Sequence, residues 1–324
     1  MSQPKKIVTL GSWHKVIFMY GDRIPAPGES VSGKYYTVTA GGKGANQACV
    51  CGLLGGNAVL IQNLGVDEDG RAAIETFKEY KTNVDYVKMV EGENTGFCCI
   101  MIDKKGENSL MTIEGAHGNY KLSDIDACEE AFKGAYMANF VLETNLDATF
   151  YAIHKAHDMG VKVFLDPAPA IPLPDEIFPC LEWIKPNEHE ASVLSGIEVK
   201  DDESALKAAQ WFRARGVKNV LITLGGDGCL LVTDEGTKKY PAPKITVVDT
   251  TTAGDTFAGA FLYALSVDMP MDDAIAYASC AGALCATKPG SIESSPRKEE
   301  LEKLYREFRP TIQYEWGRTI KQGG

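Results

Sequence analysis

Apolar runs typical of β-strands alternate along most of this chain with segments of helical periodicity, and that alternation limits the folds open to it. The strand candidates are 6–10, 58–64, 134–139, 162–166, 183–186, 219–224 and 228–233. The helix candidates are 45–54, 70–80, 146–159, 188–195, 203–215, 256–265 and 271–287. Such alternation favours a mostly parallel sheet with helices on both faces, a three-layer α/β/α fold. Ligands of such sheets bind at the carboxyl ends of the strands.

Two stretches break the alternation and predict a second, smaller sheet. Residues 34–39 alternate as a strand, and 95–103 and 108–114 flank the polar turn 104–107, a pattern typical of a hairpin. We expect these segments to form a small β-sheet that covers a pocket as a lid. The alternative is an edge extension of the main sheet. The tail, 310–324, lacks a strong pattern and is expected to be a peripheral C-terminal extension.

Charge, hydropathy and cysteine content make some partners and compartments less favourable for this chain than others. The chain has 324 residues with 33 basic and 44 acidic side chains, so its net charge is −11, which disfavours nucleic acid and anionic membranes. No apolar run reaches the roughly 18 residues of a membrane span, and the polar start 1–6 leads straight into a strand, so we expect no signal peptide. Nine cysteines without a C-x-x-C pair fit reduced thiols in a cytoplasmic protein.

Residues 249–261 read Asp-Thr-Thr-Thr-Ala-Gly-Asp-Thr-Phe-Ala-Gly-Ala-Phe and indicate a catalytic turn. Small residues lead into an apolar helix, and Asp255 lies at the turn that starts it. Free backbone N–H groups at a helix start attract an anion. A carboxylate beside such an anion cradle can take a proton from a hydroxyl while the cradle holds the phosphoryl group that the hydroxyl attacks. The alternative is an ordinary N-capped helix, because Asp is a favoured cap.

A second glycine-rich stretch, 40–48, opens the helix candidate 45–54. Its glycines let a ligand or another backbone come close, and Lys43 and Asn46 add donors near the first helical turn. The stretch lacks the spacing G-x-x-x-x-G-K-[ST], so it is not that phosphate loop. Its donors suit a polyhydroxylated ligand, whereas a tight turn is the alternative.

Two shorter segments follow strands and are weaker signals. Residues 223–228 form a glycine-rich turn of a kind that admits nucleotides but is also common in hairpins. Residues 186–190 start a helix, where Asn187 is either a ligand of the site or a helix cap, and Glu190 either takes part in the site or is solvated.

Taken together, these residues resemble the ribokinase-like (PfkB) carbohydrate kinases, and the ribokinase members most closely. The resemblance covers about residues 5–308 and is carried by two signatures, 41–48 and 249–256. Segments 166–170, 186–188 and 223–225 are also similar. The resemblance implies a kinase domain at 1–309, with the lid inserted at about 13–39 and 95–116, and an extension at 310–324.

The resemblance implies phosphoryl transfer from ATP to a sugar hydroxyl. Asp255 would be the general base, and the N–H groups of Ala253, Gly254 and Asp255 would neutralise charge on the transferred group. Mg²⁺ would bridge the ATP phosphates, with Asn187 and Glu190 reaching it through water. The matching positions for the nucleotide are Asn187, Thr223, Gly225, Gly226, Asp227, Gly228, Gly254 and Ser279. Those for the sugar are His14, Gly41, Gly42, Lys43, Asn46, Glu143 and Asp255.

The family resemblance also implies a monovalent cation, usually K⁺, and a homodimer formed through the lid. The matching cation positions, most of which would donate backbone carbonyls, are Asp249, Thr251, Cys285, Lys288, Gly290 and Ser294. Asp249 supplies the one carboxylate, and a buried cation would strengthen the field of the cradle. The hairpin residues expected to supply apolar surface for the dimer are Phe97, Cys98, Ile100 and Met101.

One departure from the family pattern concerns the sugar. Ribokinases carry an Asn-x-Asp pair after the first strand, but here His14 stands for the Asn and Val16 for the Asp. Val cannot accept a hydrogen bond, so a hydroxyl left unpaired there would cost about 1–3 kcal/mol. Our hypothesis is that the substrate is not D-ribose bound in the usual way. It is a deoxy sugar, another pentose or ketose, or a larger sugar-like alcohol whose extra group meets Trp13 and His14.

Three other functions are weighed against a sugar kinase. A nucleoside or other small-alcohol kinase of the same fold is the nearest, although nucleoside kinases normally also keep an acid where Val16 stands. A non-catalytic sugar- or nucleotide-binding relative predicts loss of the base or cradle, yet Asp255 and Gly254 are present. A dehydrogenase is excluded because no G-x-G-x-x-G follows the first strand.

Overall fold

The main body is built on one large sheet of ten strands. The computed structural model describes residues 3–311 and 315–317. The strands of this sheet are β1 (Lys6–Leu10), β4 (Asn57–Gly65), β5 (Asn83–Val90), β8 (Met137–Phe140), β9 (Lys162–Leu165), β10 (Trp183–Ile184), β11 (Asn219–Thr223), β12 (Cys229–Thr233), β13 (Gly236–Tyr240) and β14 (Glu315–Gly317). Their spatial order is β14-β13-β12-β11-β10-β9-β8-β1-β4-β5. The strands from β11 to β5 pair in parallel, whereas β12, β13 and β14 pair antiparallel at one edge.

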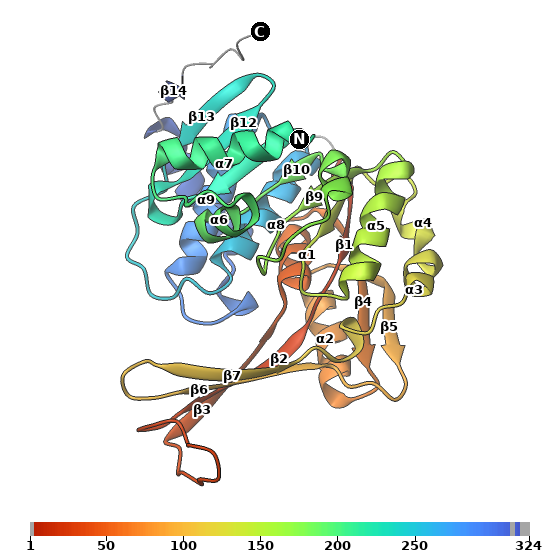
Figure 1. Cartoon of the computed structure of the whole chain (residues 1–324), viewed down its shortest axis with the longest axis vertical. Coiled ribbons are helices and arrows are strands. Elements are labelled where there is room, and N and C mark those ends of the chain that lie inside the picture. The colour runs from red at the N-terminus through yellow and green to blue at the C-terminus, as the bar shows by residue number, and fades with distance from the viewer. Residues whose placement is uncertain (1–2, 312–314, 318–324) are drawn as a thin grey trace.

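Helices cover both faces of this sheet (Figure 1). The helices are α1 (Lys43–Leu53), α2 (Glu68–Glu79), α3 (Leu122–Ala127), α4 (Glu129–Phe132), α5 (Leu146–Asp158), α6 (Glu188–Ser195), α7 (Asp202–Ala214), α8 (Ala253–Ser266), α9 (Met271–Ala286) and α10 (Lys298–Phe308). Side chains of α1, α2, α8, α9 and α10 form one apolar core, and those of α3 to α7 form a second. Two cores separated by the sheet make the predicted three-layer α/β/α architecture.

A second sheet of four strands stands apart from the body (Figure 1, bottom). It contains β2 (His14–Tyr20), β3 (Tyr35–Gly41), β6 (Gly96–Ile102) and β7 (Asn108–Ile113), in the order β3-β2-β6-β7. We call it the lid sheet. It assembles from segments far apart in sequence, as expected, and is not an edge extension of the main sheet.

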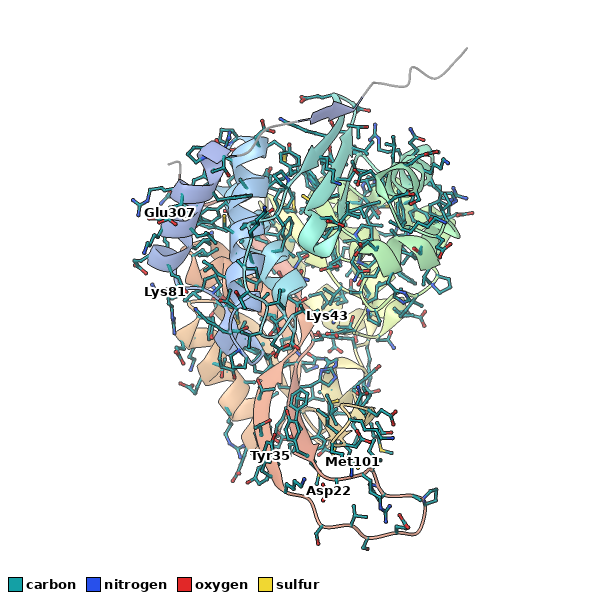
Figure 2. All side chains as sticks on the ribbon, turned by 90° about the vertical axis from the view of Figure 1, so that its left-hand side faces the viewer. Asp22, Tyr35, Lys43, Lys81, Met101 and Glu307 are labelled. Atoms are coloured by element: carbon teal, nitrogen blue, oxygen red, sulfur yellow. The ribbon has the colours of Figure 1, made fainter. Side chains whose placement is uncertain are left out.

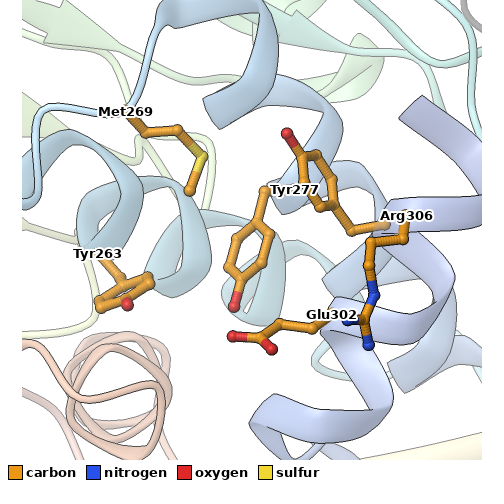
Figure 3. Close-up of a pocket in the computed structure, with 6 residues that line it drawn as sticks. Tyr263, Met269, Tyr277, Glu302 and Arg306 are labelled. Atoms are coloured by element: carbon orange, nitrogen blue, oxygen red, sulfur yellow. The ribbon is translucent and has the colours of Figure 1, made fainter. Parts of the chain in front are cut away.

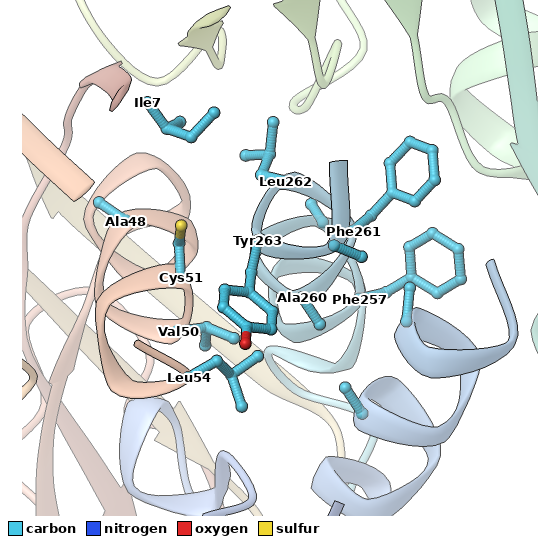
Figure 4. Packing of buried hydrophobic residues seen from close by; sticks show 14 of the residues in the cluster. Ile7, Ala48, Val50, Cys51, Leu54, Phe257, Ala260, Phe261, Leu262 and Tyr263 are labelled. Carbon is cyan, nitrogen blue, oxygen red and sulfur yellow. The ribbon is translucent and has the colours of Figure 1, made fainter. Parts of the chain in front are cut away.

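The first core brings the two helices that begin in the glycine-rich signatures into contact. Ala48 and Val50 of α1, and Leu54 just after its end, lie against α8. Leu262 and Tyr263 of α8 face them (Figure 4). A Cβ at Gly259 of α8 would stand 2.5 Å from the carbonyl oxygen of Gln47, so glycine is required for this close crossing. The crossing holds the starts of α1 and α8 side by side.

The predicted elements are present, with ends that differ by a few residues, and some elements were missed. Strand β1 and helix α6 match residue for residue. The strands β2, β5 and β13 and the helices α3, α4 and α10 were not predicted. Part of the tail adds the edge strand β14, which pairs with β13. No helix of the described part of the chain is long and apolar enough to cross a membrane.

Candidate active site

The turn before α8 presents backbone N–H groups together with Asp255. Thr252 adopts a left-handed backbone conformation with φ of 64°, which is uncommon for a β-branched residue and occurs mainly at functional turns. The N–H of Thr256 donates to the Thr252 carbonyl at 2.8 Å and closes the first helical turn. The N–H groups of Gly254 and Asp255 lie earlier in this first turn, where a helix provides no carbonyl partner for them. The N–H of Ala253, in contrast, donates to the Thr250 carbonyl at 3.2 Å. Of the three N–H groups expected in the cradle, Ala253 is therefore already engaged.

The Asp255 carboxylate is buried and is held by amide donors from α1. Asn46 Nδ2 donates to its Oδ2 at 3.0 Å, and Gln47 Nε2 lies 3.4 Å from its Oδ1. Burial raises the pKa of Asp255 to about 6, with Asp166 adding repulsion, although the nearby Lys43 opposes the rise. A carboxylate with this pKa is ionised at neutral pH and is a stronger base than an exposed aspartate.

Behind Asp255 lies a buried polar network that the sequence analysis missed. Asn139 Nδ2 donates to Gln47 Oε1 at 2.9 Å, and Gln47 Nε2 donates to Asp166 Oδ2 at 2.8 Å. The same carboxylate oxygen pairs with Lys185 Nζ at 3.0 Å. Burial alone would lower the pKa of Lys185, but Asp166 and Glu190 raise it above its ordinary value. The network thus keeps a charged lysine beneath the site.

The start of α1 supplies the second half of the site. Glu143 Oε2 accepts from the Lys43 N–H and from the Ser12 hydroxyl, each at 2.7 Å. Its other oxygen lies 3.4 Å from Lys43 Nζ. Burial would lower the pKa of Lys43, but Glu143, Asp255 and Asp166 raise it, so the side chain is a permanent cation. Figure 2 shows Lys43 where the lid strands join the body.

The glycines of this signature allow the backbone to pack closely. A Cβ at Gly42 would collide with the Ser12 carbonyl, and one at Gly44 would stand 2.7 Å from the Leu10 carbonyl oxygen. These glycines bring the start of α1 against the segment that follows β1. Their direct role is in chain packing, whereas Lys43 and Asn46 supply the polar groups.

These elements enclose a cavity of about 270 Å³ between the body and the lid sheet. Its lining residues are His14, Val16, Phe18, Thr39, Gly41, Gly42, Lys43, Asn46, Cys98, Ile100, Thr112, Glu143, Thr251, Thr252, Asp255 and Ser291. All the residues predicted to bind the sugar are among them. Trp13 is not, because its side chain is buried in the core, edge-on to Phe77, so the expectation that a substrate meets Trp13 is wrong. Cys98 and Ile100, expected in the dimer surface, face the cavity instead.

His14 enters the cavity wall beside a second, unpredicted histidine. The rings of His14 and His117 meet edge to face at 4.5 Å, and both are buried. Burial lowers the pKa of His14, and burial with repulsion from His14 lowers that of His117 to about 3. Both imidazoles are therefore neutral at pH 7.

Comparison with known proteins decides the family. A family model described as pfkB family carbohydrate kinase matches residues 4–298. The chain belongs to the pfkB family of carbohydrate kinases. Its class of activity is that of a carbohydrate kinase, a phosphotransferase that acts on an alcohol group.

Relatives of this carbohydrate kinase include several ribokinases. Ribokinase of Haemophilus influenzae is 34% identical over 296 residues, which cover 91% of this chain and 97% of that protein. The bifunctional ribokinase/ribose-5-phosphate isomerase A of Fructilactobacillus sanfranciscensis is 37% identical over 299 residues, covering 92% of this chain but 55% of that relative, so the chain spans about half its length. The structure of Arabidopsis thaliana ribokinase complexed with ribose and ATP has a TM-score of 0.87 to this one at 30% identity, covering 94% and 99% of the two chains. The expected family and fold are confirmed.

In this pfkB kinase, most residues predicted for the nucleotide lie at or after the ends of neighbouring strands, whereas Gly254 and Ser279 lie on α8 and α9, and none of them lines the cavity. Asn187, which lies beyond the end of β10, pairs with Thr223, the last residue of β11, in an isolated parallel bridge. Asn187 caps α6 and exchanges hydrogen bonds with Glu190, whose backbone N–H donates to Asn187 Oδ1 at 2.8 Å. Glu190 is buried, so the solvated alternative is wrong, and burial raises its pKa. The exposed turn Gly225–Asp227 follows β11, and Ser279 lies buried on α9.

The positions predicted for a monovalent cation come together beside the cradle. Asp249 accepts from the N–H groups of Thr251 and Gly290, at 2.9 and 3.3 Å. Cys285 Sγ lies 3.6 Å from the Thr251 carbonyl oxygen and 3.0 Å from Ser294 Oγ. The Lys288 side chain is directed away, to Glu300 at 2.7 Å, which leaves only its carbonyl for such a site. Within residues 3–311, no cluster of three His, Cys, Asp or Glu side chains is suited to a metal.

A separate cavity of about 200 Å³ is lined by α8, α9, α10 and the loop between α8 and α9 (Figure 3). Its lining residues are Tyr263, Met269, Tyr277, Glu302, Tyr305 and Arg306. None of the residues predicted for catalysis, sugar, nucleotide or cation is among them, so this cavity is not part of the candidate active site.

Proposed function

We propose that this kinase transfers the γ-phosphoryl group of ATP to a hydroxyl of a sugar or sugar-like alcohol. The observation that carries the proposal is Asp255, a buried carboxylate with a pKa of about 6 at the start of a helix and among the polar residues of the cavity. Similarity to a ribokinase whose solved structure holds ribose and ATP supports the choice of reactants.

In the proposed reaction, Asp255 accepts the proton of the acceptor hydroxyl. The hydroxyl oxygen then forms its bond to the γ-phosphorus, the bond from that phosphorus to the β–γ bridging oxygen breaks, and ADP leaves. The N–H groups of Gly254 and Asp255 face the charge that develops on the transferred group, and the positive end of α8 adds to their effect. Lys43 holds a second positive charge at the cavity and is itself positioned by Glu143.

Two metal ions are proposed as cofactors. Mg²⁺, when bound, neutralises charge on the ATP phosphates. Both oxygens of the Glu190 carboxylate already accept a hydrogen bond from Asn187. The lone pairs that remain on this carboxylate would fit contact with Mg²⁺ through water. A monovalent cation suits the loops tied together by Asp249, because its carboxylate stands there near the Thr251 carbonyl oxygen and the Cys285 thiol, which is uncharged because burial raises its pKa.

We also propose a homodimer formed through the lid sheet. Alternate residues of its strands face away from the cavity and leave an apolar surface open to solvent, with Met19, Tyr36, Val38, Met111 and Ile113 between 45% and 73% exposed. Tyr35 and Met101 also lie on the lid, as Figure 2 shows. A second copy of the chain would cover this surface. A monomeric mass in light scattering would contradict the dimer.

The test is an acceptor screen with the purified chain, ATP, Mg²⁺ and K⁺. Release of ADP is followed over a panel of pentoses, ketoses, deoxy sugars and nucleosides, and products are identified by mass spectrometry. We expect acceptor-dependent ADP release with a sugar-like acceptor. Release that no acceptor stimulates would contradict the proposed function. Saturable phosphorylation of D-ribose at micromolar to low millimolar KM would contradict the hypothesis that Val16 excludes its usual binding.

A further inference from the structure

The lid sheet presents an apolar patch to the cavity. Val16 and Phe18 of β2 pair with Cys98 and Ile100 of β6 in parallel register, and all four line the cavity. Because side chains of a strand alternate between faces, these pairs form one continuous patch on the inner face. We call it the lid patch.

Two threonines border the lid patch, and the proton of each hydroxyl is already donated within the protein. Thr39 Oγ1 donates to Glu293, which lies 3.1 Å away in the loop before α10. Thr112 Oγ1 donates to Cys98 Sγ at 3.4 Å. The inner face of the lid therefore offers a substrate hydroxyl no charged acceptor and no free hydroxyl proton, only the remaining lone pairs of the two border threonines.

The opposite wall of the same cavity is polar. Lys43, Asn46, Glu143 and Asp255 line it and contact one another through an ion pair or hydrogen bonds. His14 lies at the border between the two walls, at the start of β2. A neutral imidazole supplies one donor and one acceptor, which is enough for one hydroxyl. The cavity is thus divided into a polar wall and an apolar one.

We propose that the acceptor is an amphiphilic sugar derivative that places a deoxy or methyl-bearing edge on the lid patch and its phosphoryl-accepting hydroxyl at Asp255. This inference rests on the proposed function and specifies its substrate class as deoxy or methyl-branched sugars. A hydroxyl held against the four apolar side chains of the lid patch would lose its bond to water without gaining one from them, whereas a C–H or methyl edge gains apolar contact.

The test compares acceptors that differ in one group, D-ribose against 2-deoxy-D-ribose and 3-deoxy-D-ribose. We expect at least one deoxy member to have kcat/KM about tenfold or more above that of D-ribose. Val16→Asp and the uncharged Val16→Asn place an acceptor in the lid patch and should shift the preference toward D-ribose by a similar factor. Ile17→Asn is the matched control for Val16→Asn, since its side chain lies on the other face of β2, and it should leave the preference unchanged once light scattering has shown that the oligomeric state is kept.

Calorimetric binding of the same sugars separates the inference from the proposed function. Tighter binding of a deoxy member than of D-ribose supports the inference, whether or not phosphoryl transfer is observed. The absence of transfer to every acceptor would overturn the proposed function alone. Transfer or binding that favours D-ribose over both deoxy members would overturn the inference and leave the kinase activity standing. A preference that Val16→Asp and Val16→Asn leave unchanged, with circular dichroism showing both folded, would also overturn it.

Discussion

Replacing Asp255 by Asn is expected to stabilise the ligand-free protein while it removes the base. The pKa of Asp255 is raised from 3.8 to about 6, mainly by burial. A raised pKa means that the folded state favours the protonated carboxyl. The stabilisation that protonation brings is complete below pH 3.8 and is lost as the pH rises through 6. An amide cannot ionise and is close in shape to the protonated acid, so the variant escapes this loss.

The expected gain follows from the two pKa values. A rise of about two pH units at about 1.36 kcal/mol each corresponds to roughly 3 kcal/mol at pH 8. At pH 5 only about half of this gain remains. Because the hydrogen bonds from Asn46 and Gln47 must rearrange around an amide, the measured gain at pH 8 should lie between about 1 and 3 kcal/mol.

Urea unfolding at pH 8 and pH 5, followed by tryptophan fluorescence, measures this difference. Asp272→Asn is the control with the opposite sign. Burial raises the pKa of Asp272, but hydrogen bonds from Lys238 and Tyr240 lower it below its ordinary value, so this variant should be less stable than the wild type at pH 8. An Asp255→Asn variant no more stable than the wild type at pH 8, or one whose gain does not fall toward pH 5, would show that the pKa of Asp255 is not raised in the folded protein.

Two further predictions concern the charges around Asp255. The profile of kcat/KM against pH should fall on the acid side near pH 6. Lys43→Met should move this acid limb to higher pH, because Lys43 lowers the pKa of Asp255. An acid limb that stays in place would contradict the assignment of that limb to Asp255. Lys185→Met leaves Asp166 buried without its cation and should cost about 3–5 kcal/mol of unfolding free energy by urea titration. Lys78→Met, which removes an exposed lysine paired with Glu75, is the control and should change the unfolding free energy by less than about 0.5 kcal/mol. Equal losses in the two variants would contradict a stabilising role for the buried pair of Lys185 and Asp166.

The fold could be predicted where local signals agree with tertiary packing. Helix α6 matched because Asn187 caps its start and Gly196 ends it in a left-handed conformation, and both signals are visible in the sequence. Strand β5 was missed because it is an edge strand with mixed polarity, and its pairing with β4 decides its conformation. Helix α10 was missed although its charged and apolar residues alternate with helical spacing.

The site could be predicted in its motifs but not in its supporting network. The two signatures located Asp255, Lys43 and Asn46, because glycines and small residues mark the helix starts. Asp166 and Lys185 follow β9 and β10, two parallel strands that lie side by side, and no sequence spacing reveals that their side chains pair. The same strand-end rule that predicted ligands at this edge of the sheet was the signal that could have found them.

The central claim is that Asp255 accepts the proton of the acceptor hydroxyl. Its most direct test is the turnover of Asp255→Asn with the best acceptor from the screen, measured beside ATP binding by calorimetry. We expect a fall in kcat of about 10²–10⁴-fold with ATP affinity retained, because the variant keeps the backbone cradle and loses only the base. Turnover within a few-fold of the wild type would contradict the claim.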